Sequence, residues 1–235
     1  EHPAQQPPLL SDVTHQTGDT LAQVRIDATT NESPVARELL GWVFLAGRMV
    51  TADALHPHAD FAQQVLDLGA DYPLPVKENQ PTHFADLRDY FADPASTWTE
   101  ATTGERAHGR REERTAWATT ALDAHLASFP GVAQAIRIHR HVVCRDEGHD
   151  EITYYLTSCS PQRADAARLL ALIRGHWAIE RGHWIRDVDF GEDRSRVRSG
   201  TAPQILAALR NAIVTLLRHA GRSAIAAARR FFACH

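Results

Sequence analysis

The chain has 235 residues and a hydrophobic content of 43%, which is enough for one sizeable core with an elaboration or for two small domains. No run of eighteen apolar residues occurs, and residues 1–8 lack the basic and apolar regions of a signal peptide. We therefore expect a cytoplasmic protein without a membrane partner. The three cysteines are widely spaced and odd in number, which argues against a disulfide framework and a Cys-x-x-Cys zinc site.

The net charge of −4 is divided unevenly along the chain. Residues 161–235 hold 13 arginines, no lysine and 6 acidic residues, a balance of +7, so residues 1–160 carry −11. This asymmetry predicts a nucleic-acid-binding face toward the C-terminal end. Ordinary solvated helices are the alternative reading.

The N-terminal residues predict a leader, a hairpin and a helix. Residues 1–8 are rich in Pro and Gln and are expected to be disordered. Two apolar runs, Leu9 to His15 and Thr20 to Ile26, flank a turn signal and predict a β-hairpin. Ser33 and Pro34 then open a helix that reaches about Val43, with Ser as the cap.

A strand, a helix and a second strand are expected next, in the order of a parallel crossover. They are Arg48 to Ala52, Pro57 to about Gly69, and Tyr72 to Val76. Residues 82–160 are more polar and less regular, and they end in a hairpin formed by Ile136 to Cys144 and Ile152 to Ser158. Helical patterns follow at about 163–184, 202–219 and 222–232.

Asp53 lies at the end of the first of these strands, just before a helix. Open α/β sheets place their ligands at that edge, so Asp53 is a candidate metal ligand. A helix cap is the equally simple alternative.

Glu180 falls on the apolar stripe of the helix over residues 163–184, between Trp177 and Trp184. A buried carboxylate is costly as an ion unless something pairs with it. Its partner is either a basic side chain, namely Arg174, His176 or His183, or a metal ion.

Four blocks of sequence resemble the ISAs-type DDE transposases of bacterial insertion sequences, within the IS4-like superfamily. The blocks are Val50 to His56, Asp71 to Pro81, Ala107 to Arg114, and Ile173 to Arg198. The last block is the most specific, because tryptophans, acids and arginines recur there in fixed order. The resemblance runs from about Leu9 almost to the C-terminus.

The resemblance implies an α/β, RNase H-like catalytic core with a helical C-terminus. Residues 9–81 would form the first part of the core, residues 82–160 a β-rich insertion between the second catalytic Asp and the Glu, and residues 161–235 the catalytic helix and C-terminal helices. Asp53 matches the second Asp and Glu180 the Glu of a triad that holds Mg²⁺ or Mn²⁺. Oxygen ligands suit such hard cations, and two ions can support in-line displacement at a DNA phosphate.

The implied partner is duplex DNA, both transposon ends and target, in a cytoplasmic, nucleoid-associated bacterial protein. A homodimer is expected because two element ends must be handled together. Basic residues in the matching blocks would neutralise phosphates, and His183 is a further candidate for orienting the bound strand. The DNA-contact candidates are Lys77, Arg110, Arg111, Arg114, Arg186, Arg194, Arg196 and Arg198.

The chain departs from the family pattern at its start. The first catalytic Asp of the family lies in an Asp-Gly-Lys element, which is absent from these 235 residues. Asp12 and Asp27 are the nearest substitutes, but relatives carry a small residue at the first position, and the second reads as a turn or cap. We therefore expect this polypeptide alone to be inactive.

Two other readings remain open. A noncatalytic DNA-binding remnant would keep the arginine surface without turnover. A zinc protein is suggested by His139, His141 and Cys144 on one strand, although the cysteine falls on the opposite face from the two histidines.

Overall fold

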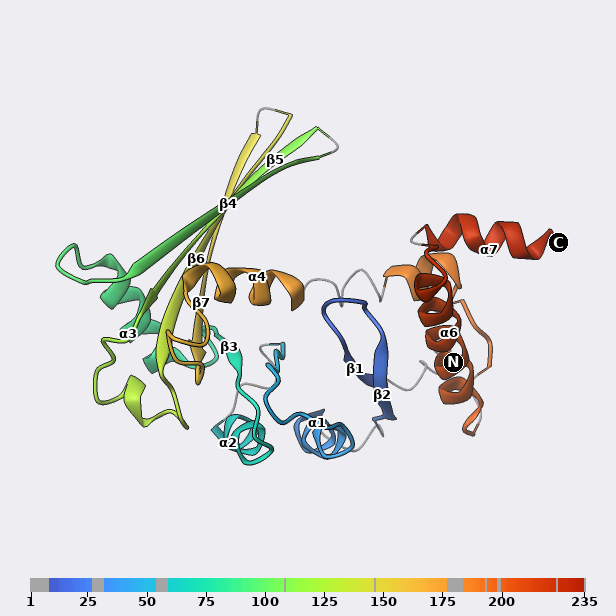
Figure 1. Ribbon diagram of the computed structural model, residues 1–235, viewed down its shortest axis with the longest axis horizontal. Coiled ribbons are helices and arrows are strands. Elements are labelled where there is room, and N and C mark those ends of the chain that lie inside the picture. Colours follow the sequence, from blue (N-terminus) through green and yellow to red (C-terminus); the bar gives the residue numbers. More distant parts are fainter. Residues whose placement is uncertain are drawn as a thin grey trace, which may run out of the picture. The chain divides into compact units, whose positions relative to one another are not determined.

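The computed structural model describes residues 9–26, 32–53, 59–107, 109–145, 147–176, 184–192, 194–197, 200–222 and 224–234. The chain divides into two compact units. We call residues 45–174 the sheet unit, and residues 1–44 together with 175–235 the hairpin unit (Figure 1).

A five-stranded antiparallel sheet in the order β3-β7-β6-β5-β4 is the centre of the sheet unit. The longest ladder joins β6 and β7 from Gln134 opposite Thr157 to Cys144 opposite Glu147. Strands β4 to β7 continue as a twisted ribbon beyond α4 in Figure 1. The strands are β3 (Pro73–Val76), β4 (Thr99–Ala107), β5 (Arg110–Thr119), β6 (Gln134–Cys144) and β7 (Glu147–Thr157).

A helix packs on each face of this sheet, near the start of β6 and the end of β7. Ile136 and Ile138 of β6 belong to a buried cluster with Leu169 of α4 (Ala166–His176). On the other face, the Tyr154 ring stacks on that of Phe91, from α3 (Pro81–Ala92). Since β-strand side chains alternate between faces, one sheet supports two apolar layers, and each fully buried Leu or Ile stabilises the fold by about 1.5–3 kcal/mol.

The region from 48 to 76 was expected to be a parallel strand-helix-strand unit, and the structure corrects this in part. Only a parallel bridge between Met49 and Asp71 forms, held by the Val50 N–H donating to the Asp71 carbonyl at 2.8 Å and the Asp71 N–H donating to that of Arg48 at 2.9 Å. The helix is α2 (Ala59–Asp67), and β3 pairs with β7 in the antiparallel sense. The segment expected to be the first strand, Arg48 to Ala52, therefore forms a single bridge and no strand. The bridge is parallel, which is the direction expected for this pair of segments.

Residues 82–160 have a polar, less regular sequence pattern and were expected to form a β-rich insertion, and the structure has regular elements there. Helix α3 and the β4–β5 hairpin fill most of it, with Thr99 opposite Ala118 and Ala107 opposite Arg110. The apolar pattern of the sequence does not reveal strand β5, because Glu112 and Arg114 are buried there as an ion pair in place of aliphatic side chains. The expected 136–158 hairpin is confirmed, and both of its strands extend further toward the turn.

The hairpin unit contains the β1–β2 hairpin and several helices. The expected hairpin is confirmed as β1 (Leu9–Val13) and β2 (Thr20–Arg25), and the expected helix over 202–219 is confirmed as α6. Ile185, Val214 and Ile225 form a small core. The helical elements are α1 (Glu32–Leu40), the π-helical turn η2 (Ile185–Asp189), α6 (Ala202–His219) and α7 (Ile225–Ala233). Among the described residues, none of the helices is long and apolar enough to cross a membrane.

Candidate functional site

Asp53 follows the segment that makes the parallel bridge to Asp71, and its side chain is exposed. The Lys77 ammonium lies 3.9 Å from Asp53 Oδ1, with relative exposures of 60% and 66% for the two side chains. Burial raises the pKa of the nearby Tyr155, and the charge of Asp53 contributes in the same direction. The Asp53 carboxylate is thus open to solvent beside one cation, where an oxygen ligand for a hard metal ion is accessible.

Glu180 and His183 lie outside the described residues, as does Arg198. The described part of the catalytic-helix candidate is α4, where Leu169 and Ile173 are buried as the apolar stripe predicts. Trp184 was expected to continue that stripe, but this was wrong because it is 56% exposed. Trp184 immediately precedes the π-helical turn η2, and the residues that join it to α4 lie outside the described residues.

The buried carboxylate of Glu112 forms ion pairs with three arginines of strands β5 and β6. It is 4% exposed and forms ion pairs with Arg110 and Arg114 on its own strand. Arg140 Nε of β6 lies 2.6 Å from Glu112 Oε1, and Arg140 Nη1 lies 3.0 Å from Glu151 Oε2. We call Glu112, Arg110, Arg114 and Arg140 the Glu112 cluster.

The electrostatics of the Glu112 cluster are those of a satisfied network. Burial by itself raises the pKa of Glu112, but hydrogen bonds from Arg140 and Arg110 and the charge of Arg114 outweigh it and leave that pKa low. Arg114 is only 8% exposed, so its guanidinium is committed to the network. Arg111 is exposed and, by strand alternation, lies on the opposite face. Of these DNA-contact candidates, Arg110 and Arg111 are therefore the accessible ones.

Sequence reasoning missed Glu112 and Arg140 as partners in this cluster. A signal was present, since Arg110, Glu112 and Arg114 recur at the period of two that places side chains on one face of a strand. Arg140 could not be added from the sequence, because the register that sets it opposite Arg114 joins two segments 26 residues apart in number.

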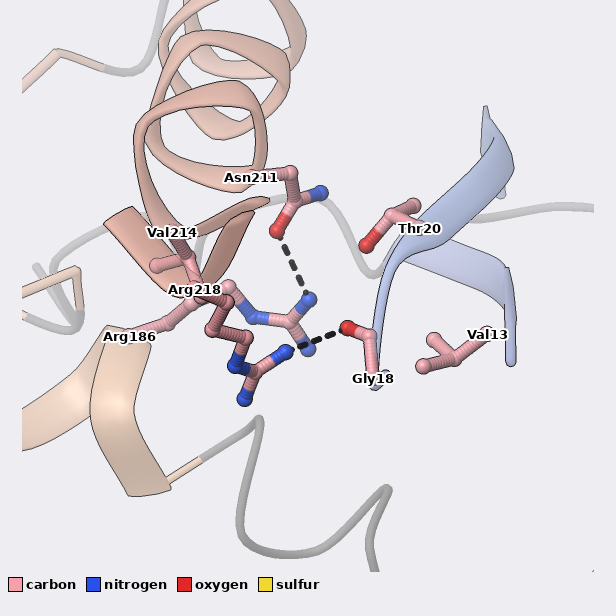
Figure 2. Close-up of a pocket in the computed structure, with 7 residues that line it drawn as sticks. All are labelled: Val13, Gly18, Thr20, Arg186, Asn211, Val214 and Arg218. Carbon is pink, nitrogen blue, oxygen red and sulfur yellow. Dashed lines mark hydrogen bonds between the residues drawn. The ribbon is translucent and has the colours of Figure 1, made fainter. Parts of the chain in front are cut away.

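Arg186 lies in η2 and is 9% exposed. Its Nη1 donates to Asn211 Oδ1 at 3.1 Å, and its Nε lies 3.6 Å from Glu192 Oε2. Figure 2 shows Arg186 in a small pocket with Arg218 and Asn211 of α6 and Gly18 and Thr20 of the β1–β2 hairpin. Arg194 and Arg196 are exposed.

The histidines of the zinc alternative instead share a carboxylate. His139 Nε2 and His141 Nδ1 lie 2.7 and 2.8 Å from Asp150 Oδ1 across β6 and β7. Cys144 is exposed. The described residues contain no cluster of three or more His, Cys, Asp or Glu side chains arranged to hold a metal ion.

The two acidic substitutes for the first catalytic Asp differ in status. Asp27 lies outside the described residues. Asp12 is partly buried in β1, and its Oδ2 has no hydrogen-bond partner among the described residues. Burial raises the pKa of Asp12 to about 6. Burial therefore disfavours the charged form of this carboxyl group, and no hydrogen bond to Oδ2 from the described residues offsets that cost.

The class of fold follows from comparison with solved structures. The chain resembles the piggyBac transposase seen in a synaptic complex with hairpin DNA, with a TM-score of 0.50, 11% identity, and coverage of 89% of this chain and 40% of that one. This confirms the expected α/β fold class of the RNase H-like DDE transposases.

The family follows from the sequence match. Residues 13–217 match the model of the transposase DDE domain, and the chain belongs to this family. Similar proteins include YncI of Escherichia coli O157:H7, 29% identical over 220 residues, and YhhI of Escherichia coli K12, 25% identical over 209 residues. Both bear transposase names, and the second is described as H repeat-associated. The matches cover 89% and 84% of this chain but only 56% and 54% of those proteins, so the chain spans about half the length of these relatives.

Proposed function

We propose that this chain is part of a DNA transposase of the DDE type, from an ISAs-type element, that cuts and joins transposon-end DNA. The observation that carries the proposal is an exposed Asp53 carboxylate at the end of the bridged segment, 3.9 Å from the Lys77 ammonium, within a transposase DDE domain. A catalytic metal ligand must be reachable from solvent, and a cation beside it suits the binding of a phosphate. Asp53 is exposed, and the Lys77 ammonium lies beside it.

In this proposal Asp53 and Glu180 hold divalent metal ions, Mg²⁺ or Mn²⁺. The fit rests on Asp53, whose exposed carboxylate is the hard oxygen donor that these ions prefer. When bound, the ions supply Lewis-acid activation of the attacking and leaving oxygens at the DNA phosphate. Lys77 binds the phosphate as a point charge, and its pairing with Asp53 keeps the ammonium beside the carboxylate in the absence of DNA.

The domain arrangement belongs to the same proposal. Residues 9–81 and 161–235 would supply the RNase H-like core, and residues 82–160, which contain most of α3 and strands β4 to β7, would be its insertion. Arg110 and Arg111 of β5, with Arg194, Arg196 and Arg198, are the proposed phosphate contacts of this arrangement. A homodimer would allow two element ends to be processed together.

The test of the metal site is a pair of matched variants. Asp53→Asn removes the proposed ligand while keeping its volume, and Asp60→Asn, another exposed acid nearby in sequence, is the control. Binding of Mn²⁺ to the full chain, followed by electron paramagnetic resonance, is expected to weaken at least about tenfold in Asp53→Asn only. Equal Mn²⁺ binding by both variants and the parent chain would refute the metal role of Asp53.

A noncatalytic DNA-binding protein is the second candidate, and it is supported by the charge of +7 in residues 161–235. Since this polypeptide alone is expected not to nick DNA, the two functions are distinguished by metal binding. Mn²⁺ binding that weakens in Asp53→Asn supports the transposase. Salt-dependent duplex binding without a Mn²⁺ site at Asp53 supports the second candidate.

A further inference from the structure

Strand β4 forms one edge of the five-stranded sheet, and β5 is its neighbour on the inner side (Figure 1). Among the described residues, no backbone hydrogen bond joins β4 to a segment other than β5. Residues 99, 100 and 102–106 are exposed. Many proteins protect such an edge with lysine, proline or a bulge, and β4 has none of these. The edge is therefore open to a further strand.

The ladder between β4 and β5 shows which backbone groups of β4 face outward. Ala107 opposite Arg110 closes the hairpin, and the closing pair around a two-residue turn is hydrogen bonded. Such pairs alternate along the ladder with pairs that are not hydrogen bonded, whose N–H and C=O groups point away from the neighbouring strand. We call the β4 residues of the latter pairs the outward set: Glu100, Thr102, Gly104 and Arg106.

Side-chain contacts support this assignment, because the pairs without hydrogen bonds bring their side chains closer together. Thr102 Oγ1 lies 3.0 Å from Thr115 Oγ1, and these residues are directly opposite each other. In the next pair of the same kind, Trp117 Nε1 donates to Glu100 Oε2 at 2.9 Å. The N–H and C=O groups of the outward set are thus the ones that another strand would meet.

Two antiparallel copies of β4 match each other in one register. With Thr103 of one copy opposite Thr103 of the other, Glu100 lies opposite Arg106, and Thr102 lies opposite Gly104. Every member of the outward set then forms a hydrogen-bonded pair with a member of the other copy's outward set. A shift of the register by two residues leaves one member unpaired on each copy. The edge is therefore complementary to itself.

The same register also places opposite charges across from each other. Each Glu100 faces an Arg106 of the other copy, at both ends of the pairing. Within its own sheet, Arg106 lies opposite Arg111, and like charges directly opposite each other are unfavourable. The other acid of β4, Glu105, already forms an ion pair with Arg174 of α4. A second copy would thus bring the carboxylate of Glu100 to a pair of arginines.

We propose that β4 pairs with β4 of a second copy of this chain, with Thr103 at the two-fold axis, so that two five-stranded sheets join into one. The contact is isologous, so it closes at a dimer. The proposed function includes a homodimer without an assigned surface, and this inference rests on that part of it. One pair of strands is a small interface, so the dimer is expected to depend on protein concentration.

The first experiment measures dimerisation of the full chain by sedimentation equilibrium. Arg106→Glu sets two acids opposite each other at both ends of the pairing, and Glu100→Arg does the same with two arginines. Each variant is expected to dimerise at least about tenfold more weakly than the parent. Arg168→Glu, at an exposed position of α4, makes the same change in net charge and should dimerise as the parent does.

A mixture of the two variants separates lost pairing from lost folding. In a dimer of one Arg106→Glu chain with one Glu100→Arg chain, opposite charges again face each other at both ends. The equimolar mixture is therefore expected to recover the affinity of the parent, although each variant alone does not dimerise well. Circular dichroism verifies the fold of each variant.

The second experiment tests the register through a disulfide, in a chain whose exposed Cys144 and Cys234 are replaced by serine. Across the proposed two-fold axis the two Cα atoms of residue 103 lie about 4.5 Å apart, within disulfide range. Thr103→Cys is expected to form a crosslinked dimer on mild oxidation. Thr102→Cys is the matched control, because its diagonal partner lies about 7 Å away or more, beyond that range.

Several results would overturn the proposal. They are a parent chain that stays monomeric at about 100 μM, an Arg106→Glu chain that dimerises as the parent does, a mixture that stays monomeric, and equal crosslinking of the two cysteine variants. Asp53→Asn is expected to dimerise normally, since Asp53 is not part of β4. The Mn²⁺ test and the dimer test can therefore fail separately.

Discussion

The two compact units each contain a carboxyl group removed from solvent, and they treat it in opposite ways. In the sheet unit, Glu112 is 4% exposed, and Arg110, Arg114 and Arg140 keep its pKa low. In the hairpin unit, burial raises the pKa of Asp12 to about 6, and its Oδ2 lacks a hydrogen-bond partner among the described residues. Burial alone therefore does not determine the state of an acid, because the charges placed opposite it decide the sign of the shift.

The same contrast holds for arginines. Arg114 faces a carboxylate in the Glu112 cluster, so its charge is used within the protein. Arg186 donates to the amide oxygen of Asn211 and shares the Glu192 carboxylate with Arg210. A count of basic residues cannot separate these two roles. The identity of the acceptor does so.

The largest expected effect is that of Glu112→Ala. Removing the shared acceptor leaves three guanidinium groups facing one another, and breaking a buried ion pair costs about 3–5 kcal/mol. Urea denaturation measures the loss in the free energy of unfolding. Glu113→Ala, on the exposed side of the same strand, is the control and should change stability by less than about 0.5 kcal/mol. Equal losses in the two variants would mean that the network does not stabilise the sheet.

Arg114→Ala is expected to have the next largest effect. It removes one buried partner of Glu112, but two other arginines still neutralise the carboxylate. We expect a loss of about 2–3 kcal/mol, below the range for a pair broken outright. Thermal unfolding of Arg114→Ala beside Glu112→Ala measures the difference. An Arg114→Ala chain that is as stable as the parent would show that this arginine is not held by the network.

Asp12→Asn should stabilise the protein, and only above a certain pH. The folded-state pKa of Asp12, about 6, exceeds the ordinary value of 3.8, so the folded chain binds the proton more tightly than the unfolded chain. Stability is therefore highest below pH 4, falls as the pH rises to about 6, and stays lower above it. The variant should gain about 1–3 kcal/mol at pH 7 and nothing at pH 3.5. Denaturation series at both pH values test this, and an equal gain at both would contradict it.

Arg111→Ala is expected to leave the unfolding midpoint unchanged, since the side chain is exposed on the face opposite the Glu112 cluster. Its effect should be on DNA alone, with the slope of log affinity against log salt reduced by about one. Fluorescence anisotropy with a labelled duplex measures that slope. If Arg111→Ala lowers stability and leaves the salt slope unchanged, Arg111 has a structural role and is not a DNA contact.

Local patterns predicted several elements well. The turn residues between β1 and β2 and the helical periodicity of α6 are properties of adjacent residues, so their bounds followed from the sequence. The sequence did not predict the single bridge at Met49 or the β4–β5 hairpin. The former is stabilised by pairing with Asp71, and the latter by ion pairs with β6, so both depend on partners distant in the chain.

The sequence by itself determined the family, the placement of Asp53 after an apolar segment, and the concentration of arginine in the C-terminal third, because each of these is written in residue order and composition. The tertiary structure alone decided which arginines are already neutralised. Strand register brings Arg140 to Glu112, and the packing of α6 on the β1–β2 hairpin brings Arg218 to Gly18. Electrostatic energies depend on distance and on exposure to water, and neither quantity is defined until the chain has folded.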